Sequence, residues 1–279
     1  MTILHDQNGN TPYKFPLGIQ MVLPDNYSRD STFAKSMELL QELRFSCIEL
    51  NIANPKLVSP SALKDYLHRY DLTMTMFASG FSAKTYGLSL SSTDIDQRLR
   101  SVDYCRRFIE FCAEMETGII LGLIQGAPVA DVSTARDLFC RSLDDLVPIA
   151  QKKRVSILIE ATNKTLTCVA NSADQTKQLV AGYPSSTVRI LLDTYHMAFE
   201  ESDTYQAIVS HAGDFDSIHY SDDNRFYPGL GQLDFQKITE SLASIDFYGP
   251  IVLEANIRNS FETDVRASVQ YLRPILARP

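Results

Sequence analysis

The sequence lacks the features that mark several large classes of protein. Its five cysteines are odd in number and include no Cys-x-x-Cys pair, so we expect small buried thiols in a reducing compartment rather than a disulfide framework. No apolar stretch approaches the roughly 18 residues that a membrane span requires. The N-terminus has no basic region followed by an apolar core, the pattern of a signal peptide. These absences predict a cytoplasmic protein with no membrane partner.

An excess of positive charge is also missing. The chain has 26 Lys and Arg against 34 Asp and Glu, which gives a formal net charge of −8. Nucleic-acid backbones reward clustered Lys and Arg, so we expect no nucleic-acid partner. The sequence contains neither the Gly-x-Gly-x-x-Gly turn of dinucleotide-binding sheets nor the Gly-x-x-x-x-Gly-Lys-Ser/Thr phosphate loop. A doubly wound open sheet is therefore disfavoured.

The 279 residues instead repeat one arrangement eight times, an apolar run followed by a segment with helical apolar spacing. Strands that alternate with helices predict a parallel sheet with right-handed crossovers. Eight units without a long linker predict a single (β/α)8 TIM barrel over 1–279, with 1–16 as a polar leader. The predicted strands are 17–23, 47–52, 72–79, 118–124, 155–160, 188–193, 215–220 and 250–255. The predicted helices are 28–43, 60–70, 93–116, 131–151, 172–181, 203–212, 233–244 and 261–276, and 80–92 is predicted to be a polar loop.

Four successive predicted strands end in residues that can bind a metal, and we call them the strand-end residues: Glu160, Asp193, His219 and Glu254. In such barrels the chemistry lies at the carboxyl ends of the strands. Neighbouring strands lie about 4.8 Å apart, so the four side chains can converge. Three carboxylates at one place repel one another unless a cation lies among them. The set predicts one divalent ion, and Mn²⁺, Mg²⁺, Co²⁺, Zn²⁺ and Fe²⁺ all accept oxygen and imidazole ligands.

Each strand-end residue also has an ordinary structural interpretation. Glu160 can pair with a Lys or Arg, and Asp193 can cap a turn. His219 can be a hydrogen-bonded core histidine, and Glu254 can be a charge at the rim. The spacings of 33, 26 and 35 residues each correspond to about one strand-plus-helix unit. This regularity favours the joint interpretation as a metal site.

Four segments around the strand-end residues are distinctive: ILIEATN (157–163), LLDTYHM (191–197), IHYSDDNRFYPGLGQLDF (218–235) and VLEAN (252–256). They resemble the xylose-isomerase-like TIM-barrel superfamily of sugar epimerases and isomerases, and most closely its D-tagatose 3-epimerase (ketose 3-epimerase) type. The most specific part is His-x-x-Asp-x-x-Arg followed by Pro-Gly-x-Gly and Asp-Phe. Members of that family often have Pro after the first Glu, where this chain has Ala161, but the Glu and Asn163 are both kept.

The resemblance implies a role for six residues. All four strand-end residues would bind one divalent metal, with Mn²⁺ as the first candidate. Glu160 and Glu254 would also be the catalytic acid and base, on opposite faces of a bound sugar. His196 and Arg225 would bind the substrate. The partner implied is a small-molecule sugar, and a homo-oligomer is compatible with the sequence.

These residue types fit proton transfer beside a carbonyl. A divalent ion near a ketone stabilises the enediolate that forms when the neighbouring hydrogen leaves as a proton. A carboxylate within hydrogen-bond reach can remove that proton. Its return on the other face gives epimerisation, and its return to the neighbouring carbon gives aldose–ketose isomerisation. We therefore expect a metal-dependent epimerase or isomerase of a ketose or related keto-sugar, an enzyme of carbohydrate metabolism.

Three alternatives use the same fold. A dehydratase of an inosose or dehydroshikimate type would use the same metal and base but expel water. An endonuclease IV-like hydrolase needs three zinc ions and further histidines after the early strands, which 47–55 and 72–80 do not contain. A non-catalytic sugar-binding barrel would not need a complete ligand set. Outside the set, Glu49 can reach the pocket or form a structural pair, and Phe81 and Tyr86 can wall the pocket or simply pack.

Overall fold

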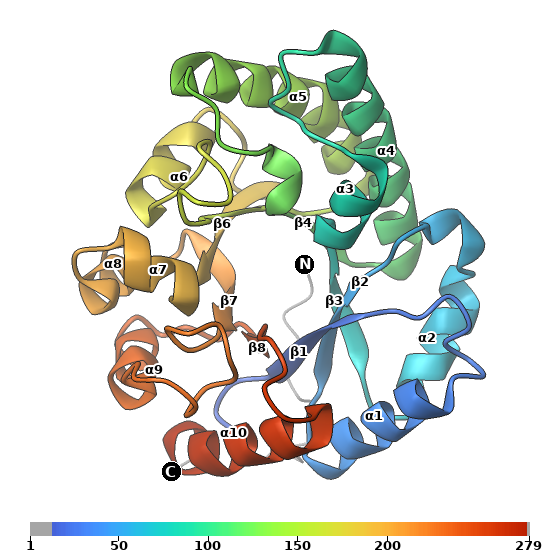
Figure 1. The fold of residues 1–279 in the computed structure, drawn as a ribbon, viewed down its shortest axis with the longest axis vertical. Coiled ribbons are helices and arrows are strands. Elements are labelled where there is room, and N and C mark those ends of the chain that lie inside the picture. The colour runs from blue at the N-terminus through green and yellow to red at the C-terminus, as the bar shows by residue number, and fades with distance from the viewer. Residues whose placement is uncertain (1–12, 278–279) are drawn as a thin grey trace.

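The computed structural model describes residues 13–277, and within them parallel strands close into one barrel with helices around it (Figure 1). The strands are β1 (Leu17–Val22), β2 (Cys47–Asn51), β3 (Thr73–Ala78), β4 (Gly118–Leu121), β5 (Ile157–Glu160), β6 (Val188–Asp193), β7 (Phe215–Tyr220) and β8 (Ile251–Leu253). Their order around the barrel follows the chain, and β8 pairs with β1 to close it. The predicted (β/α)8 TIM barrel is confirmed.

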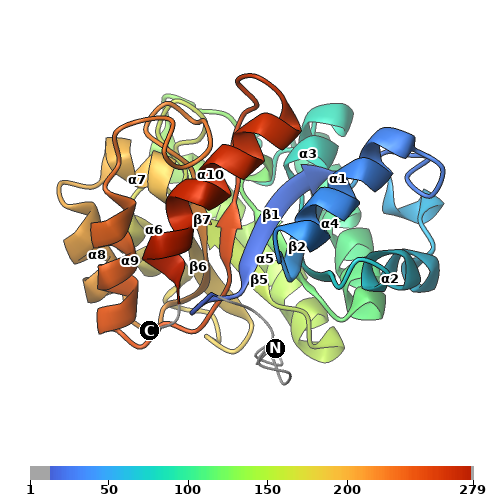
Figure 2. The same cartoon turned by 90° about the horizontal axis from the view of Figure 1, so that it is seen from below.

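Helices connect the strands and cover the outside of the barrel (Figure 2). They are α1 (Ser31–Glu42), α2 (Pro60–His68), α3 (Gly80–Tyr86), α4 (Ile95–Met115), α5 (Val132–Lys153), α6 (Ala173–Val180), α7 (Thr194–Glu200), α8 (Thr204–Ser210), α9 (Phe235–Ser244) and α10 (Phe261–Leu276), with short 3₁₀ helices η1 (Pro55–Leu57) and η2 (Leu123–Gln125). Many begin at an Asp or Ser whose side chain accepts a backbone N–H of the first turn, as Asp94 does for α4. No helix within residues 13–277 has the length and apolarity to cross a membrane.

Three local predictions were wrong, and all concern segments at the carboxyl end of the barrel. Helix α3 replaces the start of the predicted loop, where the Ser82 hydroxyl donates to Ile52 O at 2.5 Å and Gly87 ends the helix at φ 57°. Helix α7 directly follows β6 and was not predicted. Strand β4 ends before Gly122, and η2 follows it. These helices span two turns or fewer, too few for an apolar period to appear in sequence.

A small apolar layer fills the barrel below the strand-end residues. It consists of Met76, Ile120, Leu158 and Leu191, which are all almost fully buried. Leu158 lies two residues before Glu160, and Leu191 lies two residues before Asp193. Side chains two residues apart on a strand share a face, so both leucines face the barrel interior like the strand-end residues. This packed layer separates the carboxyl end of the barrel from its amino end, because bulky side chains fill the barrel rather than leave a pore.

The segment predicted as a polar leader is only partly described. Residues 1–12 lie outside the described residues. In the part that is described, the Tyr13 and Phe15 side chains are each 1% exposed. Lys14 N donates to Leu276 O at 2.7 Å, and the Phe15 ring packs 6.0 Å from the Phe247 ring. Residues 13–16 therefore belong to the packed barrel domain.

Candidate metal and active site

The four strand-end residues meet inside the carboxyl end of the barrel. Glu160 and Asp193 end β5 and β6, His219 is the penultimate residue of β7, and Glu254 directly follows β8. In the strand register Asp193 lies opposite His219, Glu160 lies opposite the residue two before Asp193, and Glu254 lies two residues beyond the partner of His219. Side chains two residues apart on a strand share a face, so all four side chains face the interior. One ligand atom from each residue lies within 4.8 Å of the other three. The convergence predicted from the sequence is therefore present.

His219 lies at the centre of this set. Its Nδ1 is 2.7 Å from Glu254 Oε2, 3.7 Å from Asp193 Oδ2 and 3.9 Å from Glu160 Oε1. Neither His219 Nδ1 nor Glu254 Oε2 makes a hydrogen bond of good geometry, although both atoms are buried, and Glu254 Oε2 has only its ion pairs with His219 and Arg225. Buried polar atoms without hydrogen bonds are costly. Three carboxylates and a free imidazole nitrogen aimed at one point fit a divalent cation that takes oxygen and nitrogen ligands.

The pKa values in the set reflect burial first and the neighbouring charges second. Burial raises the pKa of Glu160 to about 8, and the charge of Glu254 adds to the rise. Burial is the largest influence on Asp193 and Glu254 and opposes their ionisation, but Arg225 and His219 together with other nearby groups outweigh it and lower the pKa of both carboxyls. The surrounding protein cations thus keep two carboxylates ionised but not the third. A further cation among the strand-end residues would favour the ionised form of Glu160.

Arg225 lies against the strand-end residues from the loop after β7. Its NH1 is 2.5 Å from Asp193 Oδ2, and its NH2 is 3.0 Å from Glu254 Oε2. Its guanidinium carbon lies 5.0 Å from the centre of the Tyr195 ring. The Arg225 backbone has φ 62°, a left-handed conformation that is uncommon outside glycine and often occurs at functional sites. Arg225, predicted to bind substrate, is therefore beside the centre.

Asp222 shapes the loop that carries Arg225, a role that sequence analysis did not assign. Its fully buried carboxylate accepts hydrogen bonds from the backbone N–H groups of Gly229, Gly231 and Leu233 at 3.0, 2.8 and 2.9 Å. Arg225 N donates to Asp222 O at 2.9 Å. One carboxylate thus folds the Pro-Gly-x-Gly segment back on the strand end. The His-x-x-Asp-x-x-Arg motif was the signal that could have identified it.

His196 projects from α7 toward Glu160 and is held in one tautomer. Asn163 Oδ1 accepts from Thr165 N at 3.1 Å, so the Asn163 amide group faces His196 Nδ1, at 3.0 Å. Nδ1 must then accept, and the ring proton lies on Nε2. Burial lowers the pKa of His196. A neutral histidine therefore presents an N–H donor 3.7 Å from Glu160 Oε1, which suits its predicted contact with substrate oxygen.

Asp193 has two roles, because its two oxygens face different partners. Oδ1 accepts hydrogen bonds from Tyr195 N at 2.8 Å and His196 N at 3.4 Å, and so caps the start of α7. Oδ2 faces the centre of the site and Arg225. The cap anticipated as the ordinary interpretation is real. It does not compete with a ligand role, because it uses Oδ1 and leaves Oδ2, which also accepts from Arg225 NH1, facing the centre.

Three further residues were considered in the sequence, namely Glu49, Phe81 and Tyr86, and the structure shows where each one lies. Glu49 is fully buried and contacts His219, so it belongs to the site. Phe81 lies in the first turn of α3 and is 39% exposed. The Tyr86 ring packs against the Tyr104 ring, with centroids 4.8 Å apart, on α4. Tyr86 is therefore a packing residue.

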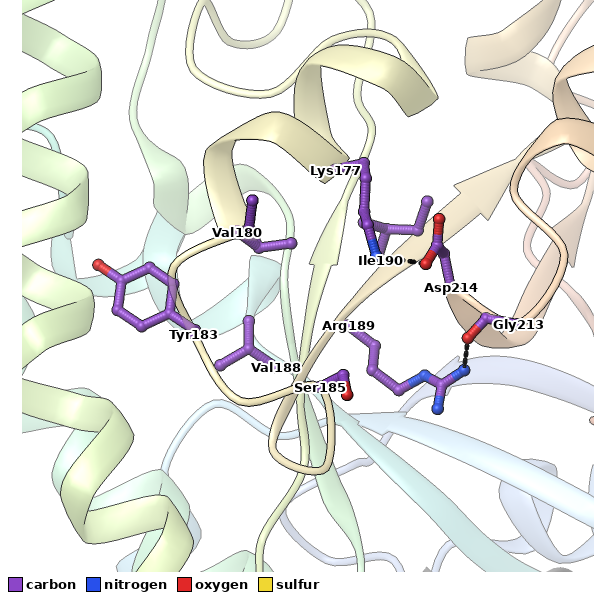
Figure 3. A pocket seen from close by; sticks show the side chains of 10 residues that line it. Lys177, Val180, Tyr183, Ser185, Val188, Arg189, Ile190, Gly213 and Asp214 are labelled. Carbon is purple, nitrogen blue, oxygen red and sulfur yellow. Dashed lines mark hydrogen bonds and ion pairs between the residues drawn. The ribbon is translucent and has the colours of Figure 1, made fainter.

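Two cavities lie away from the strand-end residues. One of about 250 Å³ lies beside α6 and the start of β6 (Figure 3). There Lys177 pairs with Asp214, and Arg189 pairs with Asp216 and the backbone oxygen of Gly213. The other, of about 1030 Å³, is lined largely by the first residues of strands and the loops before them. Since the cations in the first cavity already have carboxylate partners, it does not resemble an anion site.

Gly122 makes room for the Glu160 carboxylate. A Cβ atom at position 122 would overlap Glu160 Oε2. We expect Gly122→Ala to turn the carboxylate away from the centre and lower kcat by about 10²-fold, the effect of a displacement near 1 Å. Steady-state kinetics with thermal melting would measure this. Gly182→Ala is the control, because a Cβ there meets no atom within 4 Å, and equal kinetics in both variants would contradict the prediction.

Comparison with known proteins identifies the family of the chain. The family model described as the xylose isomerase-like TIM barrel matches residues 37–275. The D-psicose 3-epimerase of Enterocloster bolteae is 24% identical over 233 residues, which cover 80% of this chain and 76% of that protein. The crystal structure of D-psicose 3-epimerase from Clostridium cellulolyticum H10 with D-tagatose has a TM-score of 0.79 at 21% identity, over 95% of this chain and 100% of that one. The 3-keto-D-glucoside 4-epimerase from E. coli has a TM-score of 0.76 at 20% identity, over 94% and 98%. The resemblance inferred from the sequence is confirmed: the chain belongs to the xylose isomerase-like TIM barrel family.

Proposed function

We propose that this protein is a divalent-metal-dependent epimerase that acts on a ketose or a related keto-sugar. The observation that carries the proposal is the convergence of three carboxylates and an imidazole nitrogen at the carboxyl end of the barrel. The names of the relatives support the reaction class, since they include a D-psicose 3-epimerase and a 3-dehydro-D-guloside 4-epimerase. The four strand-end residues would hold one ion, with Mn²⁺ as the first choice.

The proposed reaction divides the work between the ion and the protein. When bound, the ion would supply Lewis-acid polarisation of the substrate carbonyl. Glu160 and Glu254 come from the two outer strands of the β5–β8 arc, so a sugar lying across the arc would have a carboxylate at each side. One would remove the hydrogen beside the carbonyl, and the other would return a proton on the opposite face.

The remaining residues would hold the sugar and its developing charge. The His196 Nε2–H would donate to a substrate oxygen near Glu160, because Asn163 fixes that tautomer. The Arg225 guanidinium would bind a second oxygen, since its side chain is partly exposed beside Glu254. Preorganised donors of this kind stabilise the charge of an enediolate without reorganising during the reaction.

A substrate screen with isotope detection would test the proposal. Ketoses, ketose phosphates and keto-glycosides would be incubated with Mn²⁺-loaded protein in D₂O. We expect one deuterium to enter at the carbon whose configuration inverts, with both epimers present at equilibrium. Loss of water from the sugar would identify a dehydratase instead. Absence of exchange with every keto-sugar, in protein that holds one ion per chain, would contradict the proposal.

Metal affinity should rise with pH up to about 8. Glu160 has its pKa raised to about 8, chiefly by burial. Burial lowers the pKa of His219, but Glu49 and Glu254 outweigh it and raise that pKa well above the ordinary value. Below these pKa values the ion must displace protons, so affinity falls as pH falls. We expect at least a tenfold gain in Mn²⁺ affinity per pH unit from 6 to 8, which calorimetric titration at each pH would measure. An affinity that is constant from pH 6 to 8 would contradict the prediction.

A further inference from the structure

Glu49 approaches the candidate metal site from across the barrel. Its Oε2 lies 2.9 Å from His219 Nε2, and both side chains are 0% exposed. The residues are on β2 and β7, which are not neighbouring strands. A buried carboxylate is costly without a partner. The contact with His219 therefore explains why a charged residue lies inside the barrel at this level.

A chain of side-chain hydrogen bonds holds Glu49 in place. Gln20 Nε2 donates to Glu49 Oε2 at 3.3 Å, and Asn51 Nδ2 donates to Gln20 Oε1 at 2.7 Å. Asn51 Oδ1 accepts from Phe81 N, in the first turn of α3, at 3.0 Å. Each amide has only one orientation that satisfies both of its contacts. The network thus extends from His219 through β2 and β1 to the start of α3.

The contact with Glu49 determines which nitrogen of His219 faces the strand-end carboxylates. A carboxylate can only accept, so Nε2 carries the proton that it donates to Glu49. In the neutral ring that a metal ion requires, Nδ1 therefore has the lone pair, and this is the atom that lies among the oxygens of Glu160, Asp193 and Glu254. Metal-bound histidines generally donate their other N–H to a carboxylate or carbonyl, which sets the ring orientation and raises the basicity of the ligand.

We propose that Glu49 is a positioning residue for the metal site. It holds His219 with Nε2–H toward β2 and Nδ1 toward the ion, and Gln20 in turn holds Glu49. The inference rests on the proposed function only in requiring that a divalent ion binds at the strand-end residues. It adds a residue outside the ligand set on which metal affinity depends.

Metal titration of Glu49 variants tests this. Glu49→Gln keeps an acceptor oxygen at the same place but loses the charge, and charge-assisted hydrogen bonds are about twice as strong as neutral ones. Glu49→Leu removes the acceptor. Replacing the hydrogen-bond partner of a metal-binding side chain typically weakens metal affinity 10- to 100-fold, so we expect about tenfold for Glu49→Gln and about 100-fold for Glu49→Leu. The titration would use Mn²⁺ and metal-free protein in a calorimeter.

A control and a spectroscopic measurement separate positioning from general destabilisation. Asp216→Asn changes a carboxylate on the same strand as His219, but at the opposite end of the barrel beside Arg189, and we expect unchanged Mn²⁺ affinity. In Zn²⁺-loaded protein labelled with ¹⁵N-histidine, we expect the His219 Nε2 resonance to move in Glu49→Gln while the His196 resonances stay in place. A structural role alone would not move one ring selectively.

The outcomes distinguish this inference from the proposed function. Mn²⁺ affinity of Glu49→Gln within twofold of wild type, with an unchanged His219 resonance, would overturn the inference and leave the proposed function intact. This holds even if Glu49→Leu does not fold. A wild-type protein that binds neither Mn²⁺ nor Zn²⁺ would overturn both. A graded loss from Glu49→Gln to Glu49→Leu, with Asp216→Asn unchanged, would support the positioning role.

Discussion

Replacing Glu160 or Glu254 by Gln is expected to lower kcat for epimerisation by about 10²- to 10⁴-fold, the usual contribution of a general acid or base. Gln has the shape of Glu and keeps an oxygen that can ligate, so metal content should remain close to one ion per chain. Steady-state kinetics and metal analysis of the purified variants would measure both quantities. Normal turnover in both variants would exclude the proposed mechanism.

The two variants should also differ in how they exchange hydrogen with solvent. If each glutamate serves one face of the sugar, removing one leaves the other able to exchange the hydrogen of the epimer that it faces. We expect Glu160→Gln to incorporate deuterium into one epimer without inversion, and Glu254→Gln to do so with the other epimer. NMR of each pure epimer in D₂O would detect this. Identical exchange patterns in both variants would point to a single base that serves both faces.

Asp193→Asn is expected to abolish the stabilisation that a divalent metal gives to the fold. A ligand at 100 times its Kd stabilises the native state by about 2.7 kcal/mol. For a chain of this size that raises Tm by about 5–10 °C. We expect Mn²⁺ to produce this rise in wild-type protein and EDTA to remove it. In Asp193→Asn the rise should disappear, because the amide oxygen is held as the cap of α7 and the NH2 group, which cannot bind a metal, replaces Oδ2. Thermal melts with and without Mn²⁺ would measure it.

Asp203 provides a matched control for this experiment. Like Asp193, it caps a short helix through Oδ1, which accepts from Tyr205 N at 2.9 Å and Gln206 N at 3.0 Å. Asn is about as good a cap as Asp, so neither replacement should cost much stability by itself. Asp203→Asn should keep the full metal-dependent rise in Tm. If both variants keep it, Asp193 is only a cap and the ligand assignment is wrong.

Much of the architecture could be predicted from local sequence. Apolar runs such as 188–193 are long enough to identify buried strands, and β6 and β7 have the predicted bounds. Eight strand–helix units then imply a closed barrel, because right-handed crossovers leave few other topologies. Short elements were not predictable in this way. Helices α3 and α7 depend on hydrogen bonds such as that from Ser82 to Ile52 O, which joins residues 30 positions apart.

The residues of the site could be grouped from the sequence because, in a barrel, the position of a residue along its strand fixes its level in the barrel. A polar residue at the end of a barrel strand must lie at the carboxyl mouth, so Glu160, Asp193, His219 and Glu254 could be grouped from their spacing. Their roles as metal ligands and those of His196 and Arg225 in substrate binding remain predictions. The sequence also indicated the family, through segments that the barrel places on successive strands.

By itself the sequence determined the fold, the family and the four residues that meet at the mouth of the barrel. Only the tertiary structure decided how these residues are supported. Asn163 orients His196, Asp222 folds the loop that carries Arg225, and Glu49 holds His219 from across the barrel. The physical reason is that local patterns record which face of an element is buried. A hydrogen bond between residues 170 positions apart, as between Glu49 and His219, depends on barrel closure and leaves no periodic trace in the chain.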